Sequence, residues 1–293
     1  LTVMLLLCAA ARPYWTRAVA MFGFPYTTLE SSVAFWDRRQ AEYADHETVM
    51  KYLSKGLFLD AVAAKILVER GYGKYIGVEI GEDLVEGVLC NDDAAREIIQ
   101  PPFDCISRGT HMWTANQCAA NRGGKVMEMI VTDPGTEVIT QLVTFQNQQV
   151  CPAMVRFENA LGGRIVVLGM TLEKNVSSSL FHYRRQRLFR ELIRWCSNSY
   201  VLTMEEPNVY TVMNEAAEPE KSGFIGMLTL TNLGEDPIEN AVLQLPPKWA
   251  SADRFKLLDR NCEWVEVDWT RTETSLTIRE PLCHCDPVCI LAE

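Results

Sequence analysis

Residues 55–77, KGLFLDAVAAKILVERGYGKYIG, predict a buried strand that runs directly into a capped helix. Leu57–Leu59 form a short apolar run, Asp60 stands where an N-cap is expected, and the apolar face of the following helix ends at Gly71. Many α/β hydrolytic folds place a reactive Ser or Cys on a Gly-flanked turn at such a junction. Here the turn reads Leu59-Asp60-Ala61, so the architecture is typical of an enzyme while the nucleophile is absent.

Two strand–helix units precede this one. Leu1–Leu7 is apolar throughout, and Pro13 then opens a helix. Val33–Trp36 gives a second strand, and Asp45 caps the helix that leads back to residue 56. Three such units in succession predict an α/β domain with a parallel, doubly wound sheet.

The middle of the chain carries two hairpin signals. Asp133-Pro134-Gly135 and Gly162-Gly163 supply turn chemistry, and each separates two runs that alternate well enough to be strands. The predicted strands are Lys125–Thr132, Glu137–Phe145, Ala153–Glu158 and Arg164–Met170. Residues 78–121 are less regular and predict short helices joined by loops. A long amphipathic helix is expected from about Ser178 to Cys196.

After Ser199 the helical periodicity stops and short strand-like runs follow. They are Val209–Met213, Phe224–Thr231, Ile238–Leu245, Phe255–Leu258, Glu263–Trp269, Ser275–Ile278 and Val288–Ala292. Strands this closely spaced predict an antiparallel β-sandwich. The expected organisation is therefore an α/β domain over residues 1–199 and a small all-β sandwich domain over residues 200–293.

The composition of the chain limits which binding partners and which cell compartment we expect. The chain has 293 residues, 48% apolar content and a net charge of −10, which disfavours nucleic acid and anionic membranes as partners. The opening LTVMLLLCAAA is shorter than the about 20 apolar residues of a membrane span, and we expect a buried strand. A chain that begins at Leu1 suggests a piece of a longer protein. Ten irregularly spaced cysteines favour a reducing compartment and a cytoplasmic location.

Several longer sequence segments carry a resemblance to a known family. They are GLFLDAVAAKILVERGYGKYIGV (Gly56–Val78), PAMVRFENALGGRIVVLGMTL (Pro152–Leu172), HYRRQRLFRELIRWC (His182–Cys196), EPNVYTV (Glu206–Val212), GMLTLTNLGEDPIENAVLQLP (Gly226–Pro246), FKLLDRNCEWVEV (Phe255–Val267) and PLCHCDPVCILAE (Pro281–Glu293). Their order and wording resemble the C-terminal part of glycoside hydrolase family 42 β-galactosidases. In that family a glutamine-amidotransferase-like trimerisation domain precedes a small β-domain.

The resemblance implies a fold and a non-catalytic role. It implies a flavodoxin-like domain of the class I glutamine amidotransferase type, followed by the sandwich. The sugar-cleaving site of the family lies in a (β/α)₈ barrel of about 250 residues that this chain does not match, so no catalytic residue carries over. The implied role is homo-oligomer assembly, a trimer being one arrangement, and support of that absent barrel.

Four residues are candidates for ligand contacts. Asp37 and Arg38 follow the second strand and Asp60 follows the third, at the strand ends where open α/β sheets bind ligands. Helix capping is the simpler explanation of Asp60, and a charged exposed loop that of Asp37 and Arg38. Trp264 is expected on the exposed face of its strand, where it could stack on a sugar or form a rim contact with the neighbouring domain.

The cysteines and histidines do not form a recognisable catalytic or metal motif. Cys90 lacks a glycine on each side, and Cys8 ends the first strand rather than standing on a later elbow, although His111 and His182 could serve as bases. The cluster Cys283-His284-Cys285 with Cys289 invites a zinc interpretation, but the second pair of ligands is missing unless Cys262 contributes. The prediction is no metal and no cofactor.

Two further functions remain open from the residues. One is a carbohydrate-binding module that uses Trp264 or the strand ends near Asp37 and Asp60. The other is a stand-alone amidotransferase or hydrolase that uses an unrecognised Cys and His. Binding of galactosides or plant oligosaccharides would favour the first, and turnover abolished by thiol alkylation would favour the second.

Overall fold

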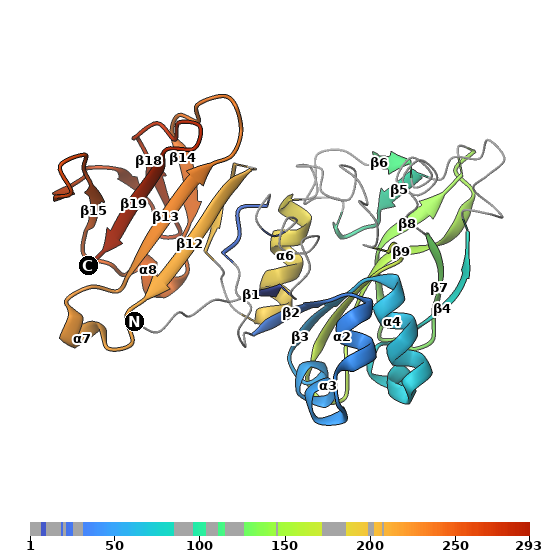
Figure 1. The fold of residues 1–293 in the computed structure, drawn as a ribbon. Coiled ribbons are helices and arrows are strands. Elements are labelled where there is room, and N and C mark those ends of the chain that lie inside the picture. Colours follow the sequence, from blue (N-terminus) through green and yellow to red (C-terminus); the bar gives the residue numbers. More distant parts are fainter. Residues whose placement is uncertain are drawn as a thin grey trace. The chain divides into compact units, whose positions relative to one another are not determined.

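The computed structural model describes most of the chain. The described residues are 7–9, 19, 22–25, 32–84, 96–103, 111–114, 126–144, 146–171, 186–198, 202–206 and 208–293. Residues 1–6 of the first predicted strand, most of the predicted helix opened at Pro13 and the start of the predicted helix Ser178–Cys196 lie outside them. The chain divides into two compact units, one containing Ser32–Ser197 and the other containing Asn198–Glu293 together with N-terminal stretches (Figure 1).

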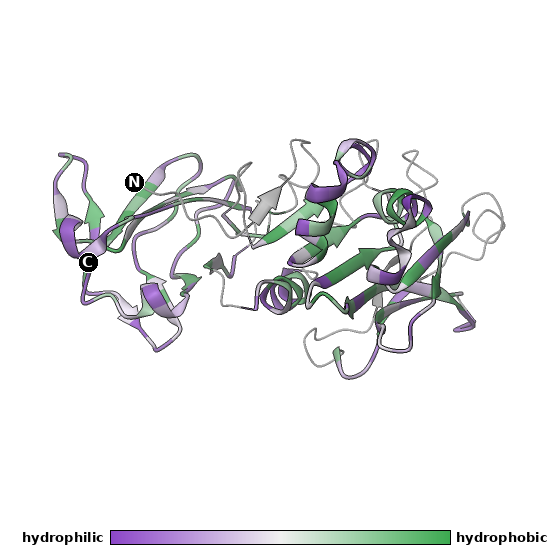
Figure 2. Ribbon diagram, turned by 90° about the horizontal axis from the view of Figure 1, so that it is seen from below, coloured by the Kyte–Doolittle hydropathy of each residue, from purple (hydrophilic) through white to green (hydrophobic). Residues whose placement is uncertain are grey.

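The larger unit contains a mixed sheet and a two-stranded sheet. Within this unit the order of the mixed sheet is β2 (Val33–Trp36), β3 (Gly56–Leu59), β10 (Arg164–Leu168), β9 (Gln149–Glu158), β8 (Glu137–Val143), β5 (Arg96–Ile99) and β6 (His111–Thr114), whereas the short strand β1 (Leu7–Ala9) belongs to an N-terminal stretch of the other unit. The two-stranded sheet pairs β4 (Val78–Asp83) with β7 (Met127–Val131). Hydrophobic residues run along the strands of this unit, whereas hydrophilic residues mark much of its helix surface (Figure 2).

The predicted flavodoxin-like, doubly wound α/β fold is wrong. Strand exceeds helix in the described residues, the strands form four sheets, and the α-helices there are six short segments. Parallel pairing joins β2 to β3 and β3 to β10, but β10–β9, β9–β8, β8–β5 and β5–β6 are all antiparallel. A doubly wound sheet needs parallel strands throughout its two halves, each joined by a crossover helix.

In the first part of this unit the strands at Val33–Trp36 and Leu57–Leu59 and the caps at Asp45 and Asp60 are confirmed, whereas a helix capped by Asp37 stands where a charged exposed loop was expected. All four residues of β2 and of β3 are buried, which suits strands in the middle of a sheet. The helices here are α2 (Arg38–Tyr43), α3 (His46–Leu53) and α4 (Ala61–Leu67), with N-caps Asp37, Asp45 and Asp60. After α4 the chain continues through the irregular turns η1 (Val68–Tyr72) and η2 (Gly73–Tyr75), where Gly71 has a φ of 90°. Glycine adopts that conformation at little cost.

Helices lie on both sides of the strands β2 and β3. In Figure 1, α2, α3 and α4 lie together on one side, and α6 (Gln186–Ser197) lies on the other. Phe58 stacks on Phe35 and on Phe189 of α6, with ring centroids 4.7 Å and 5.9 Å apart respectively. Gly56 allows the close approach of α6, since a Cβ there would lie 2.7 Å from the carbonyl oxygen of Cys196.

Of the two predicted hairpins, one is confirmed. Residues of β9 and β10 pair antiparallel around Gly162-Gly163 as expected. β7 and β8 are also strands, but the first pairs with β4 and the second with β9 and β5, so the turn at Asp133-Pro134-Gly135 passes between two sheets. The short helices expected in residues 78–121 are corrected as well, because β4, β5 and β6 occupy the larger part of what is described there.

Asn159 fixes the β9–β10 turn. Its side-chain amide nitrogen donates to the carbonyl oxygens of Leu53 and Tyr75, at 2.8 and 3.1 Å, and its side-chain oxygen accepts from the backbone N–H groups of Leu161 and Gly163. The turn therefore closes tightly onto the end of α3. Gly163 shows how tightly, since a Cβ there would lie 1.8 Å from the carbonyl oxygen of Leu53.

The smaller unit consists of two antiparallel sheets. One has the order β11 (Thr203–Met204), β14 (Ala241–Gln244), β18 (Ser275–Ile278) and β17 (Thr270–Arg271). The other has the order β12 (Val209–Glu215), β13 (Gly226–Asn232), β19 (Pro287–Ala292), β15 (Phe255–Leu258) and β16 (Trp264–Glu266). The one-turn helix α7 (Pro219–Ser222) connects β12 to β13 within one sheet, and the one-turn helix α8 (Pro247–Ala250) lies between β14 of one sheet and β15 of the other. The strands predicted after Ser199 are confirmed.

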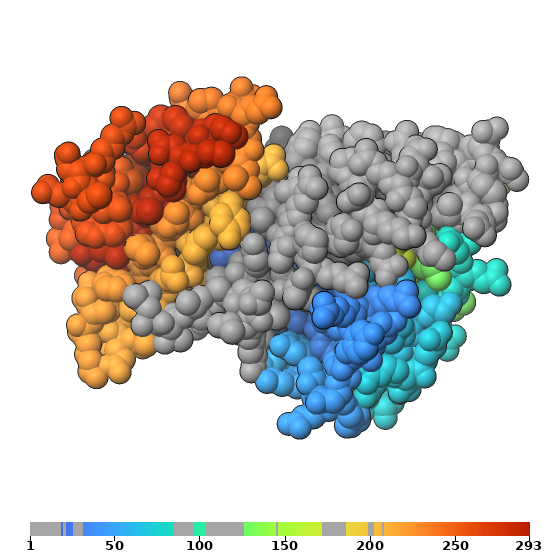
Figure 3. All heavy atoms as spheres, in the orientation of Figure 1, coloured from blue at the N-terminus to red at the C-terminus, as the bar shows by residue number. Residues whose placement is uncertain are grey.

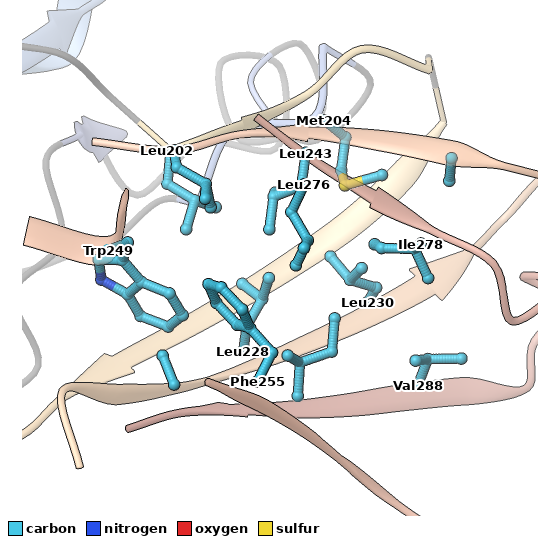
Figure 4. Close-up of a cluster of buried hydrophobic side chains, with 14 of the residues drawn as sticks. Leu202, Met204, Leu228, Leu230, Leu243, Trp249, Phe255, Leu276, Ile278 and Val288 are labelled. Carbon is cyan, nitrogen blue, oxygen red and sulfur yellow. The ribbon is translucent and has the colours of Figure 1, made fainter. Parts of the chain in front are cut away.

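One hydrophobic core lies between these two sheets. Figure 4 shows side chains of both sheets turned toward each other, with Trp249 of α8 at one end. Labelled members of the core include Leu228, Leu230, Leu243, Phe255, Leu276, Ile278 and Val288. Alternate residues of β12 and β13 point inward, which is the pattern of a sheet that is solvated on its outer face. Among the described helices none is both long and apolar enough to span a membrane.

Candidate functional site

The strongest candidate site from the sequence is the carboxyl edge of the parallel strands β2, β3 and β10. The backbone N–H of Asp60 donates to the carbonyl oxygen of Trp36, at 3.3 Å, and that of Ala61 donates to Met170, at 3.1 Å. The residues that follow the three strands are therefore neighbours. Asp37 and Asp60 lie on this edge, as the pattern of the sequence indicates.

The carboxylate of Asp37 caps helix α2. It accepts the backbone N–H of Arg39 at 2.9 Å, and the side chain of Gln40 in turn accepts the backbone N–H of Asp37 at 3.2 Å. This reciprocal arrangement is a capping box, which satisfies N–H groups that have no partner within the helix. Asp37 is buried, so its charge is directed at the start of the helix rather than at solvent.

Asp60 caps helix α4 in the same way, but at a more deeply buried position. Its side chain is fully buried, and it accepts the backbone N–H of Ala63 at 2.8 Å. No nucleophile stands at this strand–helix junction, because Leu59 and Ala61 on either side are buried apolar residues. A carboxylate in this place stabilises the fold by satisfying a buried N–H and by complementing the positive end of the helix.

Arg38 lies on the outer surface of α2. Its Nε forms an ion pair with Oε1 of Glu42, at 2.6 Å, one helical turn along the chain. Figure 3 shows the α2–α4 segment (blue to cyan) at the surface of the molecule, and Tyr43 at the end of α2 is 80% exposed. An exposed ion pair of this kind contributes little to stability and does not by itself define a ligand site.

Trp264 stands at the surface of the smaller unit, on the edge strand β16. It lies opposite Leu258 of β15 and is 37% exposed, as is its neighbour Val265. Trp269 and Val267 instead pack against the core of the sandwich. Trp264 is thus partly exposed, but Val265 on the opposite face of the strand is exposed to the same extent, so the alternation of β16 does not separate an inner face from an outer one.

The cysteines separate into buried and exposed groups. Burial raises the pKa of Cys196 far above its usual value, and it raises that of Cys151 as well. Such thiols stay protonated and unreactive. Cys8 lies within β1 rather than at its end, and His111 begins β6. Cys90 and His182 lie outside the described residues.

The residues Cys283, His284, Cys285 and Cys289 do not converge on one point. The Sγ atom of Cys289 lies 3.5 Å from Oγ1 of Thr229, whereas Sγ of Cys285 lies 3.3 Å from Nε2 of His284. Within the described part of the chain no group of three or more His, Cys, Asp or Glu side chains is placed to hold a metal ion. The thiol–imidazole contact of Cys285 and His284 is a feature that sequence reasoning considered only as part of a zinc cluster.

Two buried polar groups were not predicted from the sequence. Glu97 of β5 accepts the hydroxyl of Thr140 of β8 at 2.7 Å within the large sheet. In the sandwich, the buried carboxylate of Glu215 accepts the indole N–H of Trp249 at 2.8 Å and pairs with Lys248 at 2.9 Å. Both arrangements pair a buried carboxylate with a donor, which is the condition for burying such a group. Acidic residues in strand patterns give no sequence signal for these partners.

Comparisons with known proteins identify no relative. The chain matches no model of a known protein family, and a search of curated proteins finds no match.

Proposed function

We propose that this chain is a non-catalytic part of a carbohydrate-processing protein, and that it serves assembly and support rather than chemistry. The observation that carries the proposal is the state of the carboxyl edge of β2, β3 and β10. At two strand–helix junctions, of the kind where α/β hydrolytic folds place a reactive group, the carboxylates of Asp37 and Asp60 cap helices instead. The resemblance of its sequence phrases to the C-terminal part of family 42 β-galactosidases supports the class of the parent protein.

Exposed apolar side chains in the larger unit support an assembly role. Tyr43 of α2 is 80% exposed, and Ile130 and Val131 of β7 are 45% and 38% exposed. Apolar side chains that gather at a surface are typical of contacts between proteins, so the surfaces around Tyr43 and around Ile130 and Val131 are where we expect such a contact. A homo-oligomer, for which a trimer is the arrangement that the family resemblance suggests, would cover such side chains.

Size-exclusion chromatography with light scattering tests the assembly role. We expect a mass that is a multiple of the 33.1 kDa chain and that persists on dilution into the micromolar range. A mass of one chain at every concentration would contradict the proposal. Hydrolysis of aryl galactosides by the isolated chain would contradict the non-catalytic role separately.

A second candidate function is carbohydrate binding at the surface strand β16. Its support is Trp264, an indole that is 37% exposed on a sheet edge, since aromatic faces stack on sugar rings. Calorimetry with galactosides and plant oligosaccharides at millimolar concentration tests this function. Heat that Trp264→Ala abolishes and that Val265→Ala leaves unchanged would support it, because both side chains are exposed to the same extent. The absence of heat at millimolar ligand would remove it.

A further inference from the structure

His284 and Cys285 form an oriented thiol–imidazole pair. Nδ1 of His284 lies 2.8 Å from the carbonyl oxygen of Gly234, which can only accept, so Nδ1 carries the proton in that hydrogen bond. In a neutral imidazole the other nitrogen, Nε2, is then the acceptor. Nε2 lies 3.3 Å from Sγ of Cys285, and the thiol is therefore the donor of this contact. The thiol, the imidazole and the carbonyl of Gly234 are thus arranged as a nucleophile, a base and a group that orients the base.

The loop that holds the pair is anchored by a buried amide. The side chain of Asn232 is fully buried, donates to the carbonyl oxygens of Asp236 and Leu282, and accepts the N–H of Gly234. The backbone carbonyl of Asn232 also accepts the N–H of Cys285 at 2.9 Å. One residue thus fixes both the carbonyl that orients the imidazole and the backbone that carries the thiol.

Cys262 provides an internal comparison. Cys262 and Cys285 are both exposed, and both occupy a turn in the left-handed conformation, with φ values of 62° and 55°. No side chain in the described part of the chain forms a hydrogen bond to the sulfur of Cys262. The two thiols therefore differ chiefly in the imidazole beside Cys285.

We propose that Cys285 is a reactive thiol, that His284 is the base that deprotonates it, and that the site reacts with low-molecular-weight disulfides of the glutathione type. The proton of the Cys285 thiol passes to Nε2 of His284, and the thiolate attacks one sulfur of the disulfide. A bond forms between Sγ of Cys285 and that sulfur while the original sulfur–sulfur bond breaks, and its electron pair leaves on the other half as a thiolate. Cys285 is oxidised and the leaving half is reduced, so the chain acquires one reversible mixed disulfide.

The experiment is site-resolved kinetics on the complete chain. The protein is mixed with oxidised glutathione, quenched with acid at intervals, digested, and the mixed disulfide at each cysteine is measured by mass spectrometry. We expect Cys285 to react about tenfold faster than Cys262, less than the about 10²-fold that a positioned base supplies in a closed active site, because the pair is exposed.

His284→Asn is the matched variant. The asparagine side chain can keep a donor toward the carbonyl of Gly234, but it provides no base beside the sulfur. The rate at Cys285 is expected to fall to that of Cys262, while the rate at Cys262 stays unchanged as the control within the same sample. Equal rates at the two cysteines of the native chain would overturn the proposal, and so would a rate at Cys285 that the variant leaves unchanged. Should the variant fail to fold, the ratio of the two rates in the native chain decides alone.

Discussion

Replacing Asp60 by alanine tests whether this carboxylate stabilises the fold. In the native chain the carboxylate accepts the N–H of Ala63 at 2.8 Å, in a place where the residue is fully buried. Alanine removes the acceptor, and because the residue is fully buried, solvent does not reach the N–H group to replace it. The N–H of Ala63 would then be left buried without its partner.

The size of the effect follows from the two contributions. Loss of an N-cap costs about 1 kcal/mol, and a buried N–H without a partner costs about 1 to 3 kcal/mol. The two describe the same lost hydrogen bond and do not add, so we expect Asp60→Ala to lower the free energy of unfolding of the larger unit by about 1 to 3 kcal/mol. With a urea dependence of about 2 kcal/mol per molar, the midpoint of unfolding falls by about 0.5 to 1.5 M.

Urea unfolding followed by far-UV circular dichroism measures this loss. Asp60→Asn is the conservative control, since asparagine keeps the oxygen acceptor and caps helices about as well as aspartate. Asp45→Ala is the exposed control, because Asp45 accepts the N–H of Thr48 at the same 2.8 Å but lies at the surface, where water can replace it. We expect a clearly smaller loss for both. Unchanged or increased stability of Asp60→Ala would refute the capping explanation and would indicate a carboxylate kept for a ligand.

Three further predictions concern stability. Gly163→Ala is expected to lower the free energy of unfolding by about 3 kcal/mol or more, or to prevent folding, because the added Cβ would meet the backbone of Leu53. Gly162→Ala, at a φ of 76° with open space around the added Cβ, is expected to lower it by about 1 kcal/mol. Thermal unfolding of the two variants measures the difference. Trp249→Phe leaves the buried carboxylate of Glu215 without its indole donor and should destabilise the sandwich by about 1 to 3 kcal/mol in urea unfolding. The pKa of Glu293 is lowered by its hydrogen bonds to two basic side chains, so its stabilisation is complete above pH 4.5, its ordinary value, and is lost as the pH falls through the lower folded-state value. The difference in stability between the native chain and Glu293→Gln should therefore shrink on acidification, and a constant difference would contradict this assignment.

Local structure could be predicted from the sequence because its causes are local. Strand β3, the cap at Asp60 and the break at Gly71 depend on residues within one or two turns of each other. The turn chemistry of Gly162-Gly163 similarly identified a hairpin, since a short loop between two alternating runs leaves few other partners.

Strand pairing could not be predicted to the same degree. The turn at Asp133-Pro134-Gly135 is present, yet β7 and β8 pair with strands distant in sequence rather than with each other. The fold class failed for the same reason. Strand–helix alternation before residue 77 was extended to the whole domain, whereas β9, β8, β5 and β6 extend the sheet by antiparallel pairing. Pairing depends on the packing of faces that only the folded chain brings together.

The candidate sites show the same division. The sequence offered Asp60 as a cap or a ligand contact, and Asp37 as part of a charged exposed loop or a ligand contact. The structure shows both as caps, so the exposed loop expected at Asp37 is wrong, because Asp37 is buried and begins helix α2. The sequence offered Cys283, His284 and Cys285 as part of a zinc cluster. The contact between the imidazole of His284 and the sulfur of Cys285 depends on the left-handed backbone at Cys285 and on the carbonyl of Gly234. The amino-acid sequence gives no signal of either feature.

The four hydrogen bonds of Asn159 make this position sensitive to chemical ageing. Slow hydrolysis of its amide to a carboxylate would replace two donors by negative charge facing the carbonyl oxygens of Leu53 and Tyr75. The damaged chain would lose the link between the β9–β10 turn and the end of α3, with no change elsewhere in its sequence. The attachment of this turn to the end of α3 thus depends on the integrity of one side-chain amide.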